Sequence, residues 1–233
     1  MTAPRPRAAA SAVTRRSYDT VAERYAAEIG DELEGKPLDR ALLDAFAELT
    51  SDGPVVDVGC GPGQATAHLA RRGARTFGAD LSPAMCAVAH RATALPFAAA
   101  DMTALPIRSR SVSGILCWYA VIHLSPSERA AAYTEFARVL RPAGHALLAF
   151  HTGDDDTRPG QASHLTEWWD HPVDLTFRFL DPVAETAALA QAGLTLTARL
   201  DRAPHPGHEH PSHRTYLLVR RLPSERDAGS RIL

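Results

Sequence analysis

Two acidic residues and a glycine-rich turn have the types and spacing that could hold a nucleotide-like ligand. Asp57 ends an apolar stretch, and Gly59, Gly61 and Gly63 follow at a spacing of two. Glycine permits positive φ angles and lets the backbone approach a ligand closely. Asp80 ends the next apolar stretch, where a carboxylate can accept hydrogen bonds from both hydroxyls of a ribose. These residues predict a ligand with a ribose and a polar group near the turn.

The spacing of the glycines narrows the ligand. A dinucleotide fingerprint reads G-x-G-x-x-G, whereas this sequence reads G-x-G-x-G over residues 59–63. Asp80 does not discriminate, because an acidic residue at that point serves both nucleotide families. Asp101 follows a third predicted strand, where its carboxylate could accept from an adenine amino group. The glycine spacing therefore argues against a nicotinamide dinucleotide.

Taken together, "VDVGCGPG", "GADLSPAM", "AADMTALP" and "VLRPAGHALLAF" resemble the class I S-adenosylmethionine-dependent methyltransferases. The resemblance spans about residues 15–151 and the order of the motifs. It implies that S-adenosylmethionine is the cofactor, with Asp57 near its ammonium, Asp80 on the ribose and Trp118 bordering the sulfur. The implied cofactor-binding residues are Asp57, Gly59, Gly61, Gly63, Asp80, Leu81, Met85, Asp101, Met102 and Trp118.

Alternating strands and helices must position these residues, and this alternation predicts a mostly parallel sheet with helices on both faces. The predicted strands are 55–58, 74–80, 95–101, 114–121, 145–151, 194–201 and 215–220. The last two strands have no helix between them, so they should pair antiparallel at one edge. The expected fold is a three-layer, doubly wound α/β sheet of about seven strands, a Rossmann-like methyltransferase fold.

The domain organisation follows from these elements. Residues 15–222 are expected to form a single methyltransferase domain, in which 15–50 form a helical cap and 152–180 an irregular lid insertion. The insertion is longer than an ordinary connection, which indicates a functional role. Residues 1–14 and 223–233 are expected to be flexible.

Aromatic side chains predict the kind of methyl acceptor. Aromatic faces could stack on a flat substrate or stabilise a developing cation. The alternative is that several of them form the lid's own small core. An aromatic or indole-type small molecule of specialised metabolism, methylated on N, O or an electron-rich carbon, is the expected acceptor. The candidate substrate-binding residues are Tyr18, Tyr25, Tyr119, His123, His164, Trp168, Trp169, Phe177 and Phe179.

Methyl transfer is an in-line displacement, so a base is needed only where the acceptor atom carries a proton. His123 is the first candidate, because an imidazole titrates near neutral pH. It could equally be a structural histidine beside a helix cap. His151 is a second candidate base, and Tyr18 or Tyr25 could supply an orienting hydroxyl.

Composition limits the partners. The 233 residues carry a formal net charge of -2, so no basic surface for nucleic acid is expected. The sequence contains no asparagine, and the N/D-P-P-Y/F-type motif of amino-group DNA and protein-glutamine methyltransferases is absent. No apolar run is long enough to span a membrane, and no secretory signal is recognisable. A small-molecule substrate and a cytoplasmic location are expected, while the oligomeric state stays open.

Two polar clusters could suggest a metal. Residues 205–213 contain four histidines and a glutamate, and residues 153–156 read GDDD. Neither has a fixed ligand spacing, so solvated loops and no bound metal are expected. Three other functions stay open: a non-catalytic S-adenosylmethionine-binding protein, an NAD-dependent oxidoreductase, and, as a weaker option, a methyltransferase of macromolecules.

Overall fold

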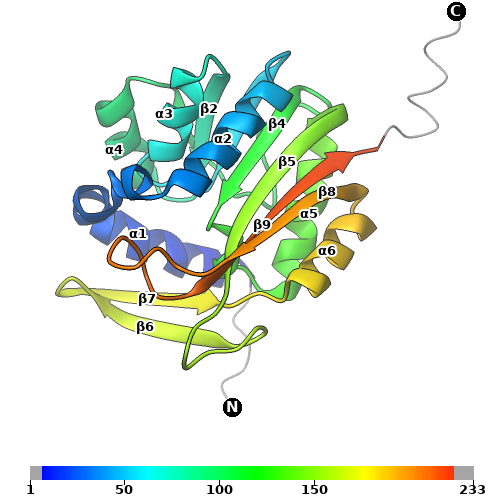
Figure 1. Cartoon of the computed structure of the whole chain (residues 1–233). Coiled ribbons are helices and arrows are strands. Elements are labelled where there is room, and N and C mark those ends of the chain that lie inside the picture. Colours follow the sequence, from blue (N-terminus) through cyan, green and yellow to red (C-terminus); the bar gives the residue numbers. More distant parts are fainter. Residues whose placement is uncertain (1–6, 223–233) are drawn as a thin grey trace, which may run out of the picture.

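The structure is a computed structural model that describes residues 7–222. Within these residues, helices cover both faces of a seven-stranded sheet, and a two-stranded sheet lies at one end (Figure 1). The helices are α1 (Arg7–Ile29), η1 (Glu32–Gly35), α2 (Pro37–Leu49), α3 (Gln64–Arg71), α4 (Pro83–Thr93), η2 (Val121–His123), α5 (Pro126–Val139) and α6 (Pro182–Gln191). The strands are β1 (Pro54–Val58), β2 (Arg75–Asp80), β3 (Phe97–Ala99), β4 (Val112–Trp118), β5 (Leu140–Gly153), β6 (Ala162–Trp168), β7 (His171–Arg178), β8 (Leu194–Arg202) and β9 (His213–Arg221).

The strand order of the large sheet is β3-β2-β1-β4-β5-β9-β8. Strands β1 to β5 run parallel, and β9 pairs antiparallel with both β5 and β8. In β5, Leu148 lies opposite Cys117 of β4 on one side and Leu217 of β9 on the other. The prediction of a doubly wound sheet with an antiparallel edge is confirmed.

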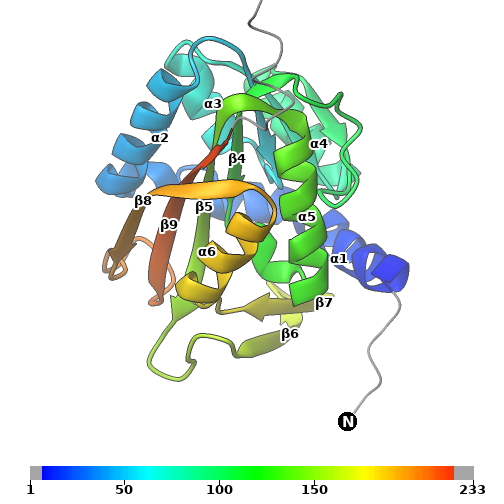
Figure 2. The same cartoon turned by 90° about the vertical axis from the view of Figure 1, so that its right-hand side faces the viewer.

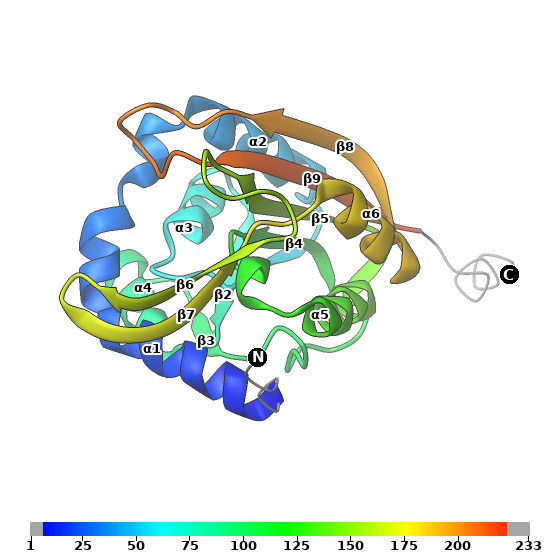
Figure 3. The ribbon, with the colours of Figure 1, turned by 90° about the horizontal axis from the view of Figure 1, so that it is seen from below.

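Successive residues of the central strands pack on opposite faces, as a pleated strand requires. Leu116 of β4 packs with Phe46 of α2 and Leu69 of α3. Its neighbour Ile115 packs on the other face with Phe136 of α5. Figure 2 shows α5 and α6 side by side, and Figure 3 shows α2 and α5 on opposite sides of the sheet.

Helix α1 and the β6–β7 hairpin both cross the carboxyl ends of the parallel strands (Figures 1 and 3). The Oγ atom of Ser17 in α1 accepts a hydrogen bond from the Asp174 amide of β7 at 2.9 Å. Val21 of α1 is buried against Val173 and Leu175 of β7. These contacts make α1 and the hairpin one cover over this edge.

Several predicted boundaries are corrected. The segment 152–180 is not irregular but contains the β6–β7 hairpin, because Val173, Leu175 and Phe177 alternate with polar residues. Residues 7–14, expected to be flexible, are the first turns of α1, whereas 1–6 and 223–233 lie outside the described residues. Helix α2 packs on the face of the sheet. Of the helical cap expected over residues 15–50, only α1 and η1 therefore lie over the carboxyl ends of the parallel strands.

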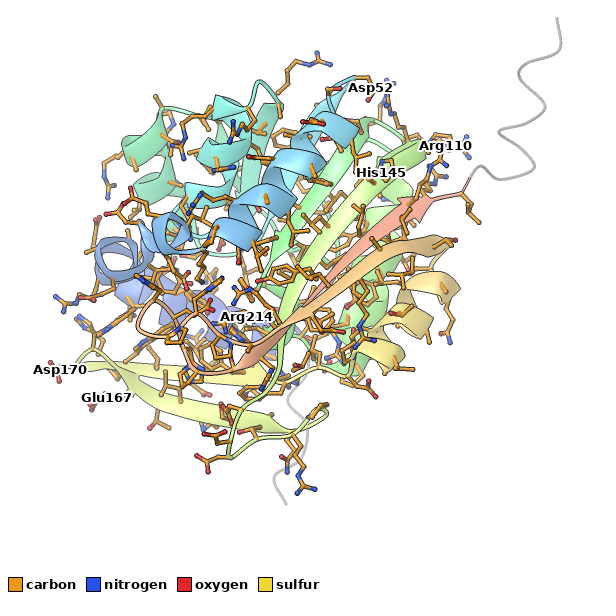
Figure 4. All side chains as sticks on the ribbon, viewed as in Figure 1. Asp52, Arg110, His145, Glu167, Asp170 and Arg214 are labelled. Carbon is orange, nitrogen blue, oxygen red and sulfur yellow. The ribbon has the colours of Figure 1, made fainter. Side chains whose placement is uncertain are left out.

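A buried network of charges ties the N-terminal helices to the edge strands. Lys36 Nζ lies 2.9 Å from Glu209 Oε2, and Arg202 Nη2 donates to Asp39 Oδ2 at 2.7 Å. Arg214, near the start of β9 (Figure 4), joins this network with its Nε 3.1 Å from Glu209 Oε2. The connection 205–213, expected to be solvated, thus carries a fully buried carboxylate at Glu209.

Candidate functional site

The strand order reverses between β1 and β4, and in open α/β sheets ligands bind beyond the strand ends at this point. Gly59 follows β1 with a φ of +72°, and a Cβ atom added to it would lie 2.2 Å from the Cβ of Ala120. Only glycine therefore allows the turn after β1 to approach the turn after β4 this closely.

A cavity lies beside this junction, between the strand ends, α1 and η2. The residues that line it are Ala10, Ser11, Thr14, Tyr18, Tyr25, Glu32, Gly59, Gly61, Gln64, Asp80, Leu81, Met85, Ala100, Asp101, Met102, Trp118, Tyr119, Ala120, His123, Leu124 and Glu128. Most residues predicted to bind the cofactor are among them. Asp57 and Gly63 are not among them.

The Asp80 carboxylate is fixed by two backbone amides at the end of β2. Oδ2 accepts a hydrogen bond from the Gly61 amide at 2.9 Å, and Oδ1 accepts from the Ser82 amide at 2.8 Å. Burial raises the pKa of Asp80, whereas these amide hydrogen bonds oppose that change. The glycine turn and Asp80 are therefore locked together, and the carboxylate lines the cavity.

Two buried oxygens beside the glycine turn lack a partner among the described residues: Oδ1 of Asp57 and Oε1 of Gln64. The other Asp57 oxygen accepts from Thr66 Oγ1 at 2.6 Å. Burial raises the pKa of Asp57 to about 7. Buried polar atoms are nearly always hydrogen-bonded, so two orphaned acceptors here are suited to a ligand with several donors.

The third acidic residue, Asp101, lies after β3 on the same cavity. Its Oδ1 accepts from both the amide and the hydroxyl of Thr103, at 2.8 and 2.6 Å. Met102 and Leu81 also line the cavity, and so does Met85, although Met85 packs in a small core with Ala22 of α1. Apolar groups and a carboxylate thus surround this end of the cavity.

Tyr18 and His123 form a hydrogen-bonded pair at the cavity wall. The Tyr18 hydroxyl lies 2.7 Å from His123 Nε2, and His123 Nδ1 lies 3.0 Å from the Thr176 carbonyl oxygen. A carbonyl can only accept, so Nδ1 carries the proton and Nε2 accepts from Tyr18. Burial lowers the pKa of His123 to about 4 and raises that of Tyr18 well above its ordinary value. The imidazole is neutral at pH 7, with its basic nitrogen on the Tyr18 hydroxyl.

The aromatic residues of the hairpin do not line this cavity. Trp168 and Trp169 stack at 4.5 Å and pack edge-on against Tyr25 of α1. Phe177 packs edge-on against His123, at 4.9 Å between ring centres. In this conformation the hairpin aromatics support the residues that face the cavity, as the alternative of a small lid core anticipates.

The other predicted residues lie elsewhere. His151 stacks on Tyr119 at 4.8 Å, and its Nδ1 bonds Ser212 Oγ, so it lies away from the cavity lining. Phe179 is buried near His151. His164 is exposed and pairs with Asp174 on the hairpin. At the tip of the hairpin, Glu167 and Asp170 point away from the rest of the protein (Figure 4).

Several residues that line the cavity are not among the predicted site residues. Gln64 directly follows the glycine turn, and this position at a helix start could have indicated it. Glu32 of η1 and Glu128 of α5 also line the cavity, and no sequence motif indicates a binding role for either. Ala10, Ser11 and Thr14 lie in the part of α1 expected to be flexible.

The described residues include no group of three or more His, Cys, Asp or Glu side chains placed to hold a metal ion. In the GDDD segment, Asp154 instead accepts hydrogen bonds from the amides of Asp156 and Thr157. No helix between residues 7 and 222 is long and apolar enough to cross a membrane.

Comparisons with known proteins agree with this geometry. Residues 55–144 match a methyltransferase domain family. The chain is 32% identical over 134 residues to a malonyl-[acyl-carrier protein] O-methyltransferase of Erwinia billingiae, covering 57% of this chain and 50% of that protein. The chain thus spans about half the length of the curated relative it matches.

Two solved structures show the shared fold. One is Burkholderia thailandensis 1,6-didemethyltoxoflavin-N1-methyltransferase with 1,6-didemethyltoxoflavin and S-adenosylhomocysteine bound (TM-score 0.72, 22% identity, 95% of this chain and 93% of that chain). The other is geranyl diphosphate C-methyltransferase of Streptomyces coelicolor (TM-score 0.61, 15% identity, 79% and 77%). Together with the strand order, they show that the chain has the fold of the class I S-adenosylmethionine-dependent methyltransferases, and residues 55–144 match a methyltransferase domain.

Proposed function

We propose that this protein transfers a methyl group from S-adenosylmethionine to a small, aromatic acceptor of specialised metabolism. One observation carries the proposal. A single cavity at the switch point joins the glycine turn and Asp80 to the Tyr18–His123 pair. Cofactor groups on one wall and a neutral base on another are what methyl transfer to a proton-bearing atom needs.

The residues present fit the cofactor. The unpaired oxygens of Asp57 and Gln64 can accept from the ammonium of its methionine part. A Cβ added at Gly61 would have only the Tyr25 ring within 4 Å, at 3.9 Å, so the turn borders open space there. Asp80 can accept from the ribose hydroxyls, and Asp101 from the adenine amino group. Trp118, Met102, Leu81 and Met85 supply the apolar surface.

When bound, S-adenosylmethionine supplies a methyl group that is activated by a sulfonium. Tyr18 and His123 manage the proton that the acceptor loses. The Tyr18 oxygen takes that proton as its own hydroxyl proton passes to His123 Nε2, which leaves Tyr18 neutral and His123 as imidazolium. The acceptor atom becomes cationic as it gains the methyl group, so its proton is acidic enough for a base with a pKa of about 4.

The cavity walls favour an aromatic acceptor without an anionic group. Tyr18, Tyr25, Trp118 and Tyr119 present ring faces or edges, which suit an aromatic or indole-type ring. The described lining residues include carboxylates but no lysine or arginine. The Streptomyces coelicolor structure holds Mg²⁺ together with geranyl diphosphate, whereas the described residues here offer neither a basic lining side chain nor a group of three side chains placed to hold a metal ion. The acceptor bound in the Burkholderia thailandensis structure, 1,6-didemethyltoxoflavin, is therefore a better first probe.

Calorimetric titration with S-adenosylmethionine, S-adenosylhomocysteine and NAD tests the cofactor. The first two should bind, and Asp80→Ala should weaken them at least tenfold, since a hydrogen bond to a charged group contributes about 1.5–3 kcal/mol. Binding of NAD instead would favour an oxidoreductase and overturn the proposal.

Transfer of a labelled methyl group tests the reaction. The acceptor panel contains 1,6-didemethyltoxoflavin, indoles and phenols, with RNA and protein lysates as macromolecular controls. Label on a small aromatic acceptor supports the proposal. Label on RNA or protein alone contradicts it, and cofactor binding without any transfer would support a non-catalytic binding protein.

A further inference from the structure

The β7 strand contacts His123 at three separate points. The Thr176 carbonyl accepts from His123 Nδ1 at 3.0 Å, and the Phe177 ring packs against the imidazole at 4.9 Å. Arg178 Nη1 donates to the backbone carbonyl oxygen of His123 at 2.8 Å. Three consecutive residues of one strand thus fix the tautomer, the ring and the backbone of this histidine.

The Arg178 contact matters because the turn that carries His123 has little support of its own. η2 is only three residues long, and its N-cap residue, Ala120, has no side-chain hydrogen bond that caps it. Its end is held from outside, since Arg178 binds the carbonyl of His123 and Arg129 of α5 binds that of Leu124, each at 2.8 Å. Backbone carbonyls at a helix end need such partners.

Arg178 also acts on the imidazole electrostatically. The charged and titratable groups around His123 are Tyr18 from α1, Glu128 and Arg129 from α5, and Arg178 from β7. Burial is the main cause that lowers the pKa of His123, the Thr176 hydrogen bond opposes it, and the positive charge of Arg178 adds a smaller lowering. The same side chain therefore holds the backbone of His123 and favours the neutral ring.

We propose that Arg178 is a positioning residue for His123, which makes the competence of this base depend on the hairpin being seated on η2. The proposal rests on the role of His123 in the proposed function. In this proposal, the contacts of β7 hold His123 so that its Nε2 faces the Tyr18 hydroxyl. The packing of β7 on η2 is thereby linked to the orientation of the base.

Nuclear magnetic resonance of histidine-labelled protein saturated with S-adenosylhomocysteine tests this without a known acceptor. The imidazole ¹⁵N shifts report tautomer and titration, and the signal missing in His123→Gln assigns His123. In the native chain we expect a single Nδ1–H tautomer that titrates near pH 4. Arg178→Met should give mixed tautomers and move the midpoint upward by about half a pH unit, because a nearby positive charge is lost.

Two variants control for a merely structural role. Arg178→Lys should restore the low midpoint, because it keeps the charge. Arg199→Met removes an exposed guanidinium that pairs with Asp201 on β8 and should leave the His123 signal unchanged. An unchanged tautomer and midpoint in Arg178→Met, or equal changes in Arg199→Met, would overturn the proposal.

The affinity for S-adenosylhomocysteine separates positioning from general damage to the fold. It should stay within twofold of native in Arg178→Met, and a collapse of this affinity would overturn the proposal in favour of a structural role. A separate experiment shows whether His123 is the base at all. If it is not, His123→Gln should methylate the acceptor identified by the labelled-methyl panel at the native rate. That result would remove the positioning role as well.

Discussion

Asp57 is the residue in which burial and ligand chemistry are most directly linked. Its carboxyl group is enclosed behind the glycine turn, one oxygen bonds Thr66, and the other has no partner among the described residues. Burial raises its pKa to about 7, so in the free protein the group changes charge near neutral pH. An arriving ammonium group would favour the ionised form.

Cofactor affinity should therefore increase with pH. Below pH 7 the protonated Asp57 must lose its proton before it can accept from the ammonium, so the affinity for S-adenosylhomocysteine should increase from pH 6 to pH 8 and then level off. Calorimetry in buffers of different ionisation enthalpy should detect the released proton.

Two controls isolate this effect. 5′-Methylthioadenosine has no ammonium, so its affinity should not follow the titration of Asp57. Asp57→Asn should bind S-adenosylhomocysteine more weakly and without this pH dependence. The same pH dependence for both ligands would contradict the assignment.

His123 gives a second pH prediction, in which the loss on acidification comes at a lower pH because its pKa is shifted downward. Its pKa of about 4 lies below the ordinary value of 6.5, so the base stays neutral until the pH is well below 6.5. With an acceptor from the labelled-methyl panel, the turnover rate should be flat from pH 8 to pH 5 and fall with a midpoint near pH 4. Circular dichroism must show folded protein over this range, and a midpoint near 6.5 would mean that the base is solvated or is another group.

At the scale of elements, the turn after β1 can be predicted from the sequence, whereas the contacts of the hairpin cannot. The glycine spacing and the antiparallel edge follow from local rules, and both are present. The partner of His123 Nδ1 is a backbone carbonyl of Thr176, 53 residues away, and no side-chain pattern marks it. Predicting it needs the register of a hairpin against η2, which tertiary packing decides.

The turn after β1 allows a matched comparison of two glycines. Gly59 and Gly73 have φ angles of +72° and +85°, so the left-handed backbone alone should cost about 1–2 kcal/mol of stability with alanine at either position. Only at Gly59 does the added Cβ meet another atom, the Cβ of Ala120 at 2.2 Å.

Gly59→Ala should therefore also lose binding of S-adenosylhomocysteine, whereas Gly73→Ala should keep it. Chemical denaturation measures the first effect and calorimetry the second. Retained binding in Gly59→Ala would show that the approach of the two turns is not needed for the cofactor.

At the scale of the whole molecule, a charge network joins segments that are far apart in the chain. Lys36, the only lysine in the sequence, is buried and contacts Glu209, which also contacts Arg202 and Arg214. Composition cannot reveal this, because prolines and histidines make the segment 205–213 resemble a solvated loop. The burial comes from the packing of the β8–β9 connection against the end of η1, where His208 lies next to Gly35.

Glu209→Gln should destabilise the protein strongly. It leaves the buried cations Lys36, Arg202 and Arg214 without their central carboxylate, and breaking one partner of a buried pair costs about 3–5 kcal/mol. Glu28→Gln, which removes an exposed partner of Arg24 on α1, should change the stability by less than about 1 kcal/mol. Chemical denaturation at pH 7 compares the two.

The same network sets the sign of the acid dependence. Desolvation would raise the pKa of Glu209, but hydrogen bonds from Arg202, the His205 amide and Lys36 outweigh it and lower the pKa to about 2, from 4.5. The folded state thus gains this stabilisation fully above pH 4.5 and loses it as the pH falls from 4.5 to 2. Denaturation at several acidic pH values should show this loss in the native chain and a smaller one in Glu209→Gln. Equal slopes in both proteins would mean that Glu209 is not ionised inside the network, and that the three cations are balanced by Asp39 and Glu32 instead.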